Sequence, residues 1–97
     1  IDEMADVLRF LSDHIPIEVG KTPGDPLSIQ YIFKFPNEYG ARVSRGKNSY
    51  GGPQGFWEVA VLNKKGKITY STKITDDVLG FLNDVQVSEV LYEISDL

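Results

Sequence analysis

Apolar and polar side chains alternate along the centre of the chain, which is the pattern of strands that bury one face. Four segments show this alternation: 27–35, 39–44, 56–62 and 67–72. The last two are separated by Asn63–Gly66, a hairpin turn in which the glycine suits a left-handed position. Because short connections join successive strands most easily when they run antiparallel, the pattern predicts a four-stranded antiparallel sheet.

The amino-terminal segment has helical spacing instead. Apolar residues recur at i, i+3, i+4 and i+7 from Met4 to Leu11, which predicts a helix that ends before Pro16. Residues 20–26 are rich in glycine and proline and are expected to form a loop.

Two further helices are expected at the carboxyl end. Thr75 is followed by two aspartates, a typical helix start, and predicts a short helix up to residue 82. Asn83 begins the next helix, because Gln86 three residues later completes a capping-box pattern. The apolar stripe of that helix runs from Val87 to Ile94. The expected fold is therefore α+β, with one N-terminal and two C-terminal helices around the sheet (αββββαα).

The length of 97 residues fits a single domain, residues 1–97. Met4 is the sole methionine, which raises the expectation that residues 1–3 are additions to the natural domain. The absence of cysteine excludes disulfides, thiolate metal sites and cysteine nucleophiles, and it favours a reducing, cytoplasmic compartment. The sequence has no apolar run long enough to span a bilayer, so no membrane partner is expected.

The net charge of −4 is unevenly distributed. Residues 1–20 carry five acidic side chains and one basic; residues 21–73 carry nine basic and three acidic; residues 74–97 carry six acidic and none basic. One interpretation is that the acidic ends pack near the basic centre and partly neutralise it. The other is that an acidic helical face binds a basic groove on a partner protein.

Three segments of the second half carry a resemblance: GGPQGFWEVAVL at 51–62, ITYST at 68–72 and ITDDVLGFL at 74–82. Together they resemble a set of small uncharacterised proteins encoded by bacteriophages and prophages. The resemblance implies an accessory role inside the host cell. It implies no activity and no particular binding residues.

The sequence contains no pattern for catalysis. His14, the only histidine, falls at the expected end of the first helix, and there is no G-x-S-x-G, H-E-x-x-H or P-loop pattern. Asp76 and Asp77 are adjacent, and adjacent helical residues point about 100° apart, so a helix start explains them better than a metal site. We therefore expect no enzymatic activity, no metal and no cofactor.

The candidate binding residues surround a glycine-rich loop at 46–55. Arg42, Arg45, Lys47 and Tyr50 bring positive charge and an aromatic ring to it. One hypothesis is that they bind single-stranded nucleic acid or RNA by phosphate contact and stacking; the plain alternative is a flexible hairpin connection.

The leading hypothesis is an accessory protein that binds a host or phage protein through a sheet edge, the acidic helices or this loop. A homodimer through an exposed strand edge stays open. Trp57 and the aromatic residues of Tyr31–Phe35 are expected in the core, and would become interface anchors if they were exposed.

Overall fold

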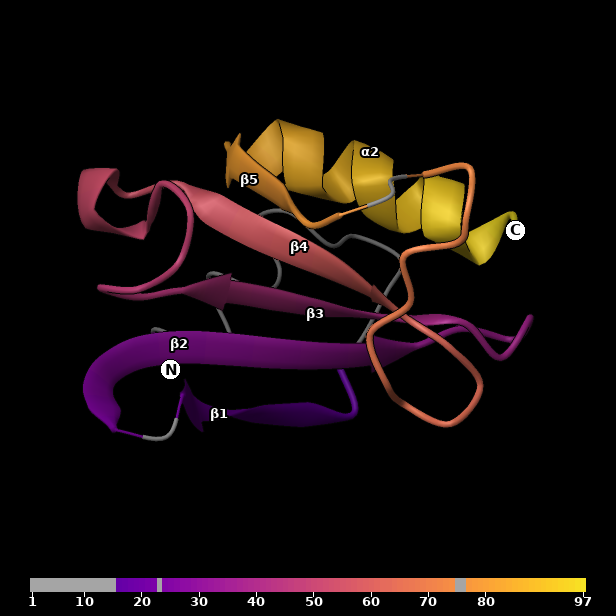
Figure 1. Ribbon diagram of the computed structural model, residues 1–97, viewed down its shortest axis with the longest axis horizontal. Helices are drawn as coiled ribbons and strands as arrows, with labels where there is room; N and C mark the ends of the chain where they lie inside the picture. Colours follow the sequence, from indigo (N-terminus) through magenta and orange to yellow (C-terminus); the bar gives the residue numbers. More distant parts are fainter. Residues whose placement is uncertain (1–15, 23, 75–76) are drawn as a thin grey trace.

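A five-stranded antiparallel sheet is the centre of the computed structural model, which describes residues 16–22, 24–74 and 77–97. The strands follow one another across the sheet in chain order, with β1 and β5 at opposite edges (Figure 1). Their bounds are Glu18–Thr22 (β1), Asp25–Lys34 (β2), Gly40–Arg45 (β3), Trp57–Leu62 (β4) and Leu79–Leu82 (β5). A short 3₁₀ helix, η1 (Gly52–Gln54), lies between β3 and β4, and helix α2 (Asp84–Ser95) follows β5.

The α+β class and the antiparallel pairing agree with the sequence, but the predicted αββββαα order is wrong in its details. The sheet has five strands rather than four, and the described residues contain one C-terminal α-helix rather than two. The helix expected over Met4–Leu11 lies outside the described residues.

Strand β1 occupies part of a segment predicted to be a loop. The predicted loop over residues 20–26 is shorter than expected, because Thr22 and Asp25 already pair with each other as part of β1 and β2. Gly24 in that connection has a φ of 81°, which glycine adopts without the steric cost of a side chain. The signal for the strand was present, since Ile17, Glu18 and Val19 alternate apolar and polar.

The expected strand over residues 67–72 does not form. The hairpin turn at Asn63–Gly66 is present, and the amide of Asn63 donates to the carbonyl of Lys67 at 2.7 Å. Pairing then stops at the bridge between Leu62 and Ile68 and the bond from the Thr69 amide to Val61. The hydroxyls of Thr69 and Ser71 lie 3.1 Å apart, and such local side-chain bonds compete with a strand ladder.

Strand β5 replaces the first of the two expected C-terminal helices. Leu82 and Leu79 pair with Trp57 and Val59, and this pairing provides hydrogen-bond partners for backbone groups at that edge of β4. A short apolar run is compatible with either helix or strand, so tertiary pairing decides. Gly80 also packs so closely on Tyr50 that a Cβ atom would have no room there.

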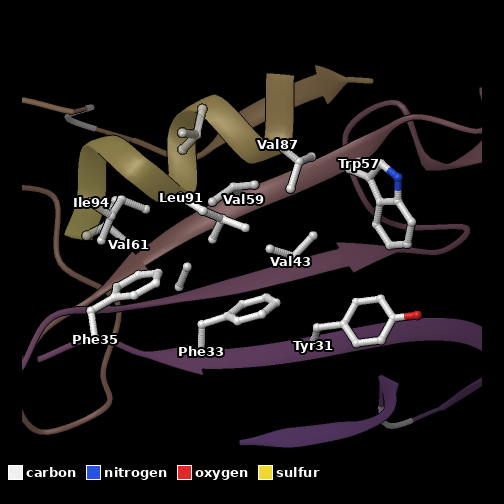
Figure 2. Close-up of a cluster of buried hydrophobic side chains, with 12 residues drawn as sticks. Tyr31, Phe33, Phe35, Val43, Trp57, Val59, Val61, Val87, Leu91 and Ile94 are labelled. Carbon is white, nitrogen blue, oxygen red and sulfur yellow. The ribbon is translucent and has the colours of Figure 1, made fainter. Parts of the chain in front are cut away.

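Helix α2 begins as the sequence predicts. The Asn83 side chain accepts from the Gln86 amide at 2.8 Å, and the Gln86 side chain accepts from the Asn83 amide at 2.9 Å. The expected apolar stripe is buried against β3, β4 and β5. Figure 2 shows Leu91 and Ile94 from this stripe directed toward the sheet.

The core lies between α2 and one face of the sheet, which we call the helix face. Its largest fully buried side chains include Tyr31, Phe33 and Trp57, as the alternation predicts. In Figure 2 the aromatic rings of β2 form a row along the strand, with Trp57 beyond Val43. Trp57 and the aromatic strand are therefore core residues rather than interface anchors.

The carboxyl end of α2 is tied to the turn between β2 and β3. The side-chain amide of Asn37 donates to the carbonyl oxygens of Ile94, at 2.8 Å, and Leu97, at 3.2 Å. Its side-chain oxygen accepts from the Tyr39 amide at 3.0 Å. One polar side chain thus adds two hydrogen bonds to carbonyl groups at the helix end.

Candidate functional site

The four candidate binding residues do not form one site. Successive side chains of a strand point to opposite faces of the sheet, so Arg45, like Val43, belongs to the helix face. Arg42 belongs to the other side, which we call the second face. The register places Arg42 between Ile32 on β2 and Ala60 on β4. The two arginines therefore cannot contact one ligand on a single face.

Arg45 has a structural role. Its guanidinium carbon lies 4.2 Å from the centroid of the Trp57 ring, a cation–π arrangement that closes the end of the core. The indole of Trp57 also contacts α2, through a hydrogen bond that its N–H donates to Asp84 at 2.9 Å. Arg45 is thereby held against the domain rather than extended toward a partner.

The loop at 46–55 is folded and bonded to its neighbours. The Lys47 amide donates to Asp25 at 3.0 Å, and the Tyr50 amide donates to Glu58 at 2.9 Å. The Ser49 hydroxyl accepts from the Gly46 amide at 2.9 Å. These bonds occupy three backbone donors that a phosphate-binding loop would offer to its ligand. Of the basic candidates, Lys47 is exposed, whereas Arg42 and Arg45 are half-buried.

Tyr50 belongs to a cluster that sequence reasoning missed. Three aromatic side chains, Tyr50, Phe56 and Phe81, form what we call the aromatic patch. Tyr50 and Phe81 are each 58% exposed and Phe56 is 39% exposed. The rings of Phe56 and Phe81 lie 6.3 Å apart, and the Phe81 amide donates to the Tyr50 carbonyl at 3.1 Å. Phe81 lies in the segment that the sequence predicts to be a short helix, so periodicity does not reveal its neighbours.

Phe81 also has an unusual backbone. Its φ is +56°, and among the described residues Glu38 is the other non-glycine with a positive φ. A bulky aromatic residue rarely adopts this left-handed conformation, which stores free energy and clusters at functional sites. The conformation directs Phe81 outward beside Phe56, while Leu79 and Leu82 of the same strand pack on the core.

A second surface feature lies on the second face of the sheet. A hollow of about 250 Å³ opens there beside the 46–49 turn, lined by polar side chains that include Gln30, Arg42, Ser44 and Glu58. The Arg42 side chain is half-buried, and no described residue forms a hydrogen bond or an ion pair with it. Arg42 lines this hollow, whereas Arg45 and Lys47 line a different one.

Over the described ranges, no cluster of three or more histidine, cysteine, aspartate or glutamate side chains is arranged to hold a metal ion. Within that same part of the chain, no helix has the length and apolar character to cross a bilayer. His14, Asp76 and the helix start expected at Thr75 lie outside the described residues.

Comparisons with protein-family models, with curated proteins and with solved structures found no match to this chain. The two surfaces that bear on function are therefore the aromatic patch and the hollow at Arg42.

Proposed function

We propose that this chain is a non-catalytic accessory protein that binds another protein through the aromatic patch. The observation that carries this proposal is the exposure of three aromatic residues on a domain with a well-formed core, two of them 58% exposed. The Phe56 and Phe81 rings contact each other, and a backbone hydrogen bond joins Phe81 to Tyr50. Exposed aromatic residues in a contiguous patch mark protein interfaces, where they provide most of the binding free energy.

The charges around the patch define the partner. Glu58 lies beside Tyr50 and accepts from its amide, and residues 74–97, which include Phe81, contain no basic side chain. The matching surface is an apolar pocket with a basic rim, because opposite charges at the edge speed association and exclude wrong partners. The resemblance of the segments within residues 51–82 to phage and prophage proteins supports a partner inside a host cell.

The alternative, binding of single-stranded nucleic acid, has less support. Arg42 and Arg45 lie on opposite faces, and Arg45 is stacked on Trp57. The amides of Lys47 and Tyr50 are bonded to carboxylates, which also repel phosphate. One exposed lysine beside Tyr50 supports at most weak, salt-sensitive binding.

The test compares immobilised wild-type chain with Tyr50→Ser and Phe81→Ser in a host lysate, with quantitative mass spectrometry of the bound proteins. Tyr70→Ser is the matched control, since Tyr70 is 53% exposed but follows Thr69, which bonds to the far end of β4. We expect at least one protein that the control retains and both patch variants lose by tenfold or more, by the usual scale of an anchor residue. Equal recovery by all four proteins, each with a native circular dichroism spectrum, would show the proposal to be wrong.

A further inference from the structure

Arg42 lies in the middle of the sheet, and its side chain has no hydrogen-bond or ion-pair partner among residues 16–22, 24–74 and 77–97. Its strand, β3, is flanked on both sides, and its neighbours across the two ladders are Ile32 and Ala60. A guanidinium that is partly removed from water benefits from a planar anion that accepts two parallel hydrogen bonds. None of the described carboxylates is paired with it.

Arg42 lies where two hollows meet. The polar hollow of about 250 Å³ extends from it toward the 46–49 turn. A second hollow, of about 570 Å³, extends toward the 66–68 segment and has an apolar part made by Ile17, Ile32, Leu62 and Ile68. Gln30 and Arg42 line both hollows. We call the combined feature the Arg42 groove: acceptor groups at one end, a cation in the middle and aliphatic side chains at the other end.

Small residues lie next to Arg42 and Gln30 on the neighbouring strands. Ala60, the β4 neighbour of Arg42, has a small side chain, and Gly20, the β1 neighbour of Gln30, has none. An added Cβ at Gly20 would meet no atom within 4 Å. These two positions therefore place no large side chain next to Arg42 and Gln30.

The acidic groups of the groove select the charge of the anion. Asp25 and Glu58 line the polar end, and Glu18 lines the other hollow together with Lys67, so the groove has three acidic side chains against two basic ones. A phosphate monoester carries about −1.5 to −2 at neutral pH, so these carboxylates repel it more strongly than a carboxylate ligand with a single charge. The aliphatic end favours a ligand with an apolar chain next to that charge.

We propose that the Arg42 groove binds a monocarboxylate with a short aliphatic chain. The carboxylate pairs with the Arg42 guanidinium and is within the polar surroundings of Gln30 and Ser44, and the chain lies along Ile32 and Leu62. This site is on the second face and is independent of the aromatic patch, so neither proposal depends on the other.

The test is a titration of ¹⁵N-labelled protein, followed by amide chemical shifts, with hexanoate as the probe. Acetate lacks the chain, hexanol lacks the charge and hexyl phosphate carries the second charge. N-acetyl-leucine distinguishes a peptide-type carboxylate from a fatty-acid type. We expect saturable shifts at residues 30, 32, 42 and 44 with hexanoate or N-acetyl-leucine. We expect binding at least tenfold weaker for acetate, hexanol and hexyl phosphate, the scale of one lost charge-assisted interaction.

Arg42→Gln should weaken hexanoate binding about tenfold or more, because glutamine keeps a donor but loses the charge and the planar fork. Lys47→Gln is the matched control, since Lys47 is an exposed cation on the adjacent turn that does not line the groove. The proposal is wrong if neither hexanoate nor N-acetyl-leucine gives saturable shifts, if Arg42→Gln binds hexanoate as well as wild type, or if hexyl phosphate binds more tightly. Unchanged amide spectra of the free variants establish that both are folded.

Discussion

The indole N–H of Trp57 donates to Oδ1 of Asp84 at 2.9 Å, and this bond joins the start of β4 to the first turn of α2. Trp57 is 1% exposed, so water cannot replace the carboxylate without a structural change. Asp84 also lies where the helix dipole favours a negative charge. One side chain therefore fixes the position of the helix on the sheet and satisfies the one polar group of a core aromatic residue.

Replacement of Asp84 by alanine should lower stability by about 1–3 kcal/mol, because it leaves a buried donor without a partner. On a domain of this size, each kcal/mol corresponds to a Tm lower by about 4–8 °C. Thermal unfolding followed by fluorescence of the single tryptophan measures this change. Glu89→Ala, at an exposed acid of the same helix, is the control and should change Tm little. A Tm for Asp84→Ala equal to that of the control would contradict the prediction.

Asn37→Ala should loosen the end of α2. The substitution removes the two bonds to Ile94 and Leu97 and the bond from the Tyr39 amide. We expect a loss of about 1–2 kcal/mol, in line with a lost helix cap, and faster hydrogen exchange confined to the last turn of α2. Asn83→Ala provides the comparison at the opposite end, where faster exchange should appear in the first turn. Uniformly faster exchange along α2 in Asn37→Ala would argue against a local effect.

Phe81→Gly should be more stable than Phe81→Ala by about 1 kcal/mol, because the φ of +56° is unfavourable for any residue with a Cβ atom. Both substitutions remove the ring contact with Phe56, so the difference between their free energies of unfolding reports the backbone conformation at residue 81. Urea unfolding of the two variants gives the comparison.

The control pair is Val85→Gly and Val85→Ala, at an exposed position in the ordinary helical backbone of α2. At residue 85 the order of stability should be reversed, with the alanine variant more stable than the glycine variant by up to about 1 kcal/mol. The same order at both positions would show that residue 81 is unstrained.

Gly80→Ala should destabilise the pairing of β5 by about 1–3 kcal/mol, the usual cost of an overpacked site. The added methyl group would overlap the Cβ of Tyr50 and lie 3.2 Å from its carbonyl oxygen. The urea midpoint measures the loss, and Gly20→Ala on β1 is the control because its methyl group meets no atom within 4 Å. If both variants unfold at the wild-type midpoint, the close approach of β5 to Tyr50 is incorrect.

The parts of the fold that local physics specifies were predictable. The hairpin at Asn63–Gly66, the capping box at Asn83 and the buried stripe of α2 each depend on neighbouring residues alone. Which segment pairs with the outer edge of β4 was not predictable from local sequence. Residues 67–69 contact one end of that edge and β5 pairs with the other, and this division depends on tertiary packing. Gly80 was a signal against a helix, since glycine inside a helix is unfavourable by about 1 kcal/mol.

The candidate site was predicted only in part. Arg42, Arg45, Lys47 and Tyr50 are close in sequence, but strand alternation directs the two arginines to opposite faces. That division follows from the register and could have been read from the odd and even positions of β3. The aromatic patch could not be predicted from strand alternation, because Phe81 lies near Tyr50 and Phe56 only when β5 is paired with β4.

The meander order of the strands has a consequence for how the chain folds. Strands β1 to β4 form three successive hairpins, so their contacts are close in sequence and each closure costs little chain entropy. The pairing of β5 must instead close the longer connection over residues 63–78 before α2 can cover the core. We therefore expect substitutions in the β2–β3 and β3–β4 hairpins to slow folding, and substitutions in β5 and α2 mainly to speed unfolding.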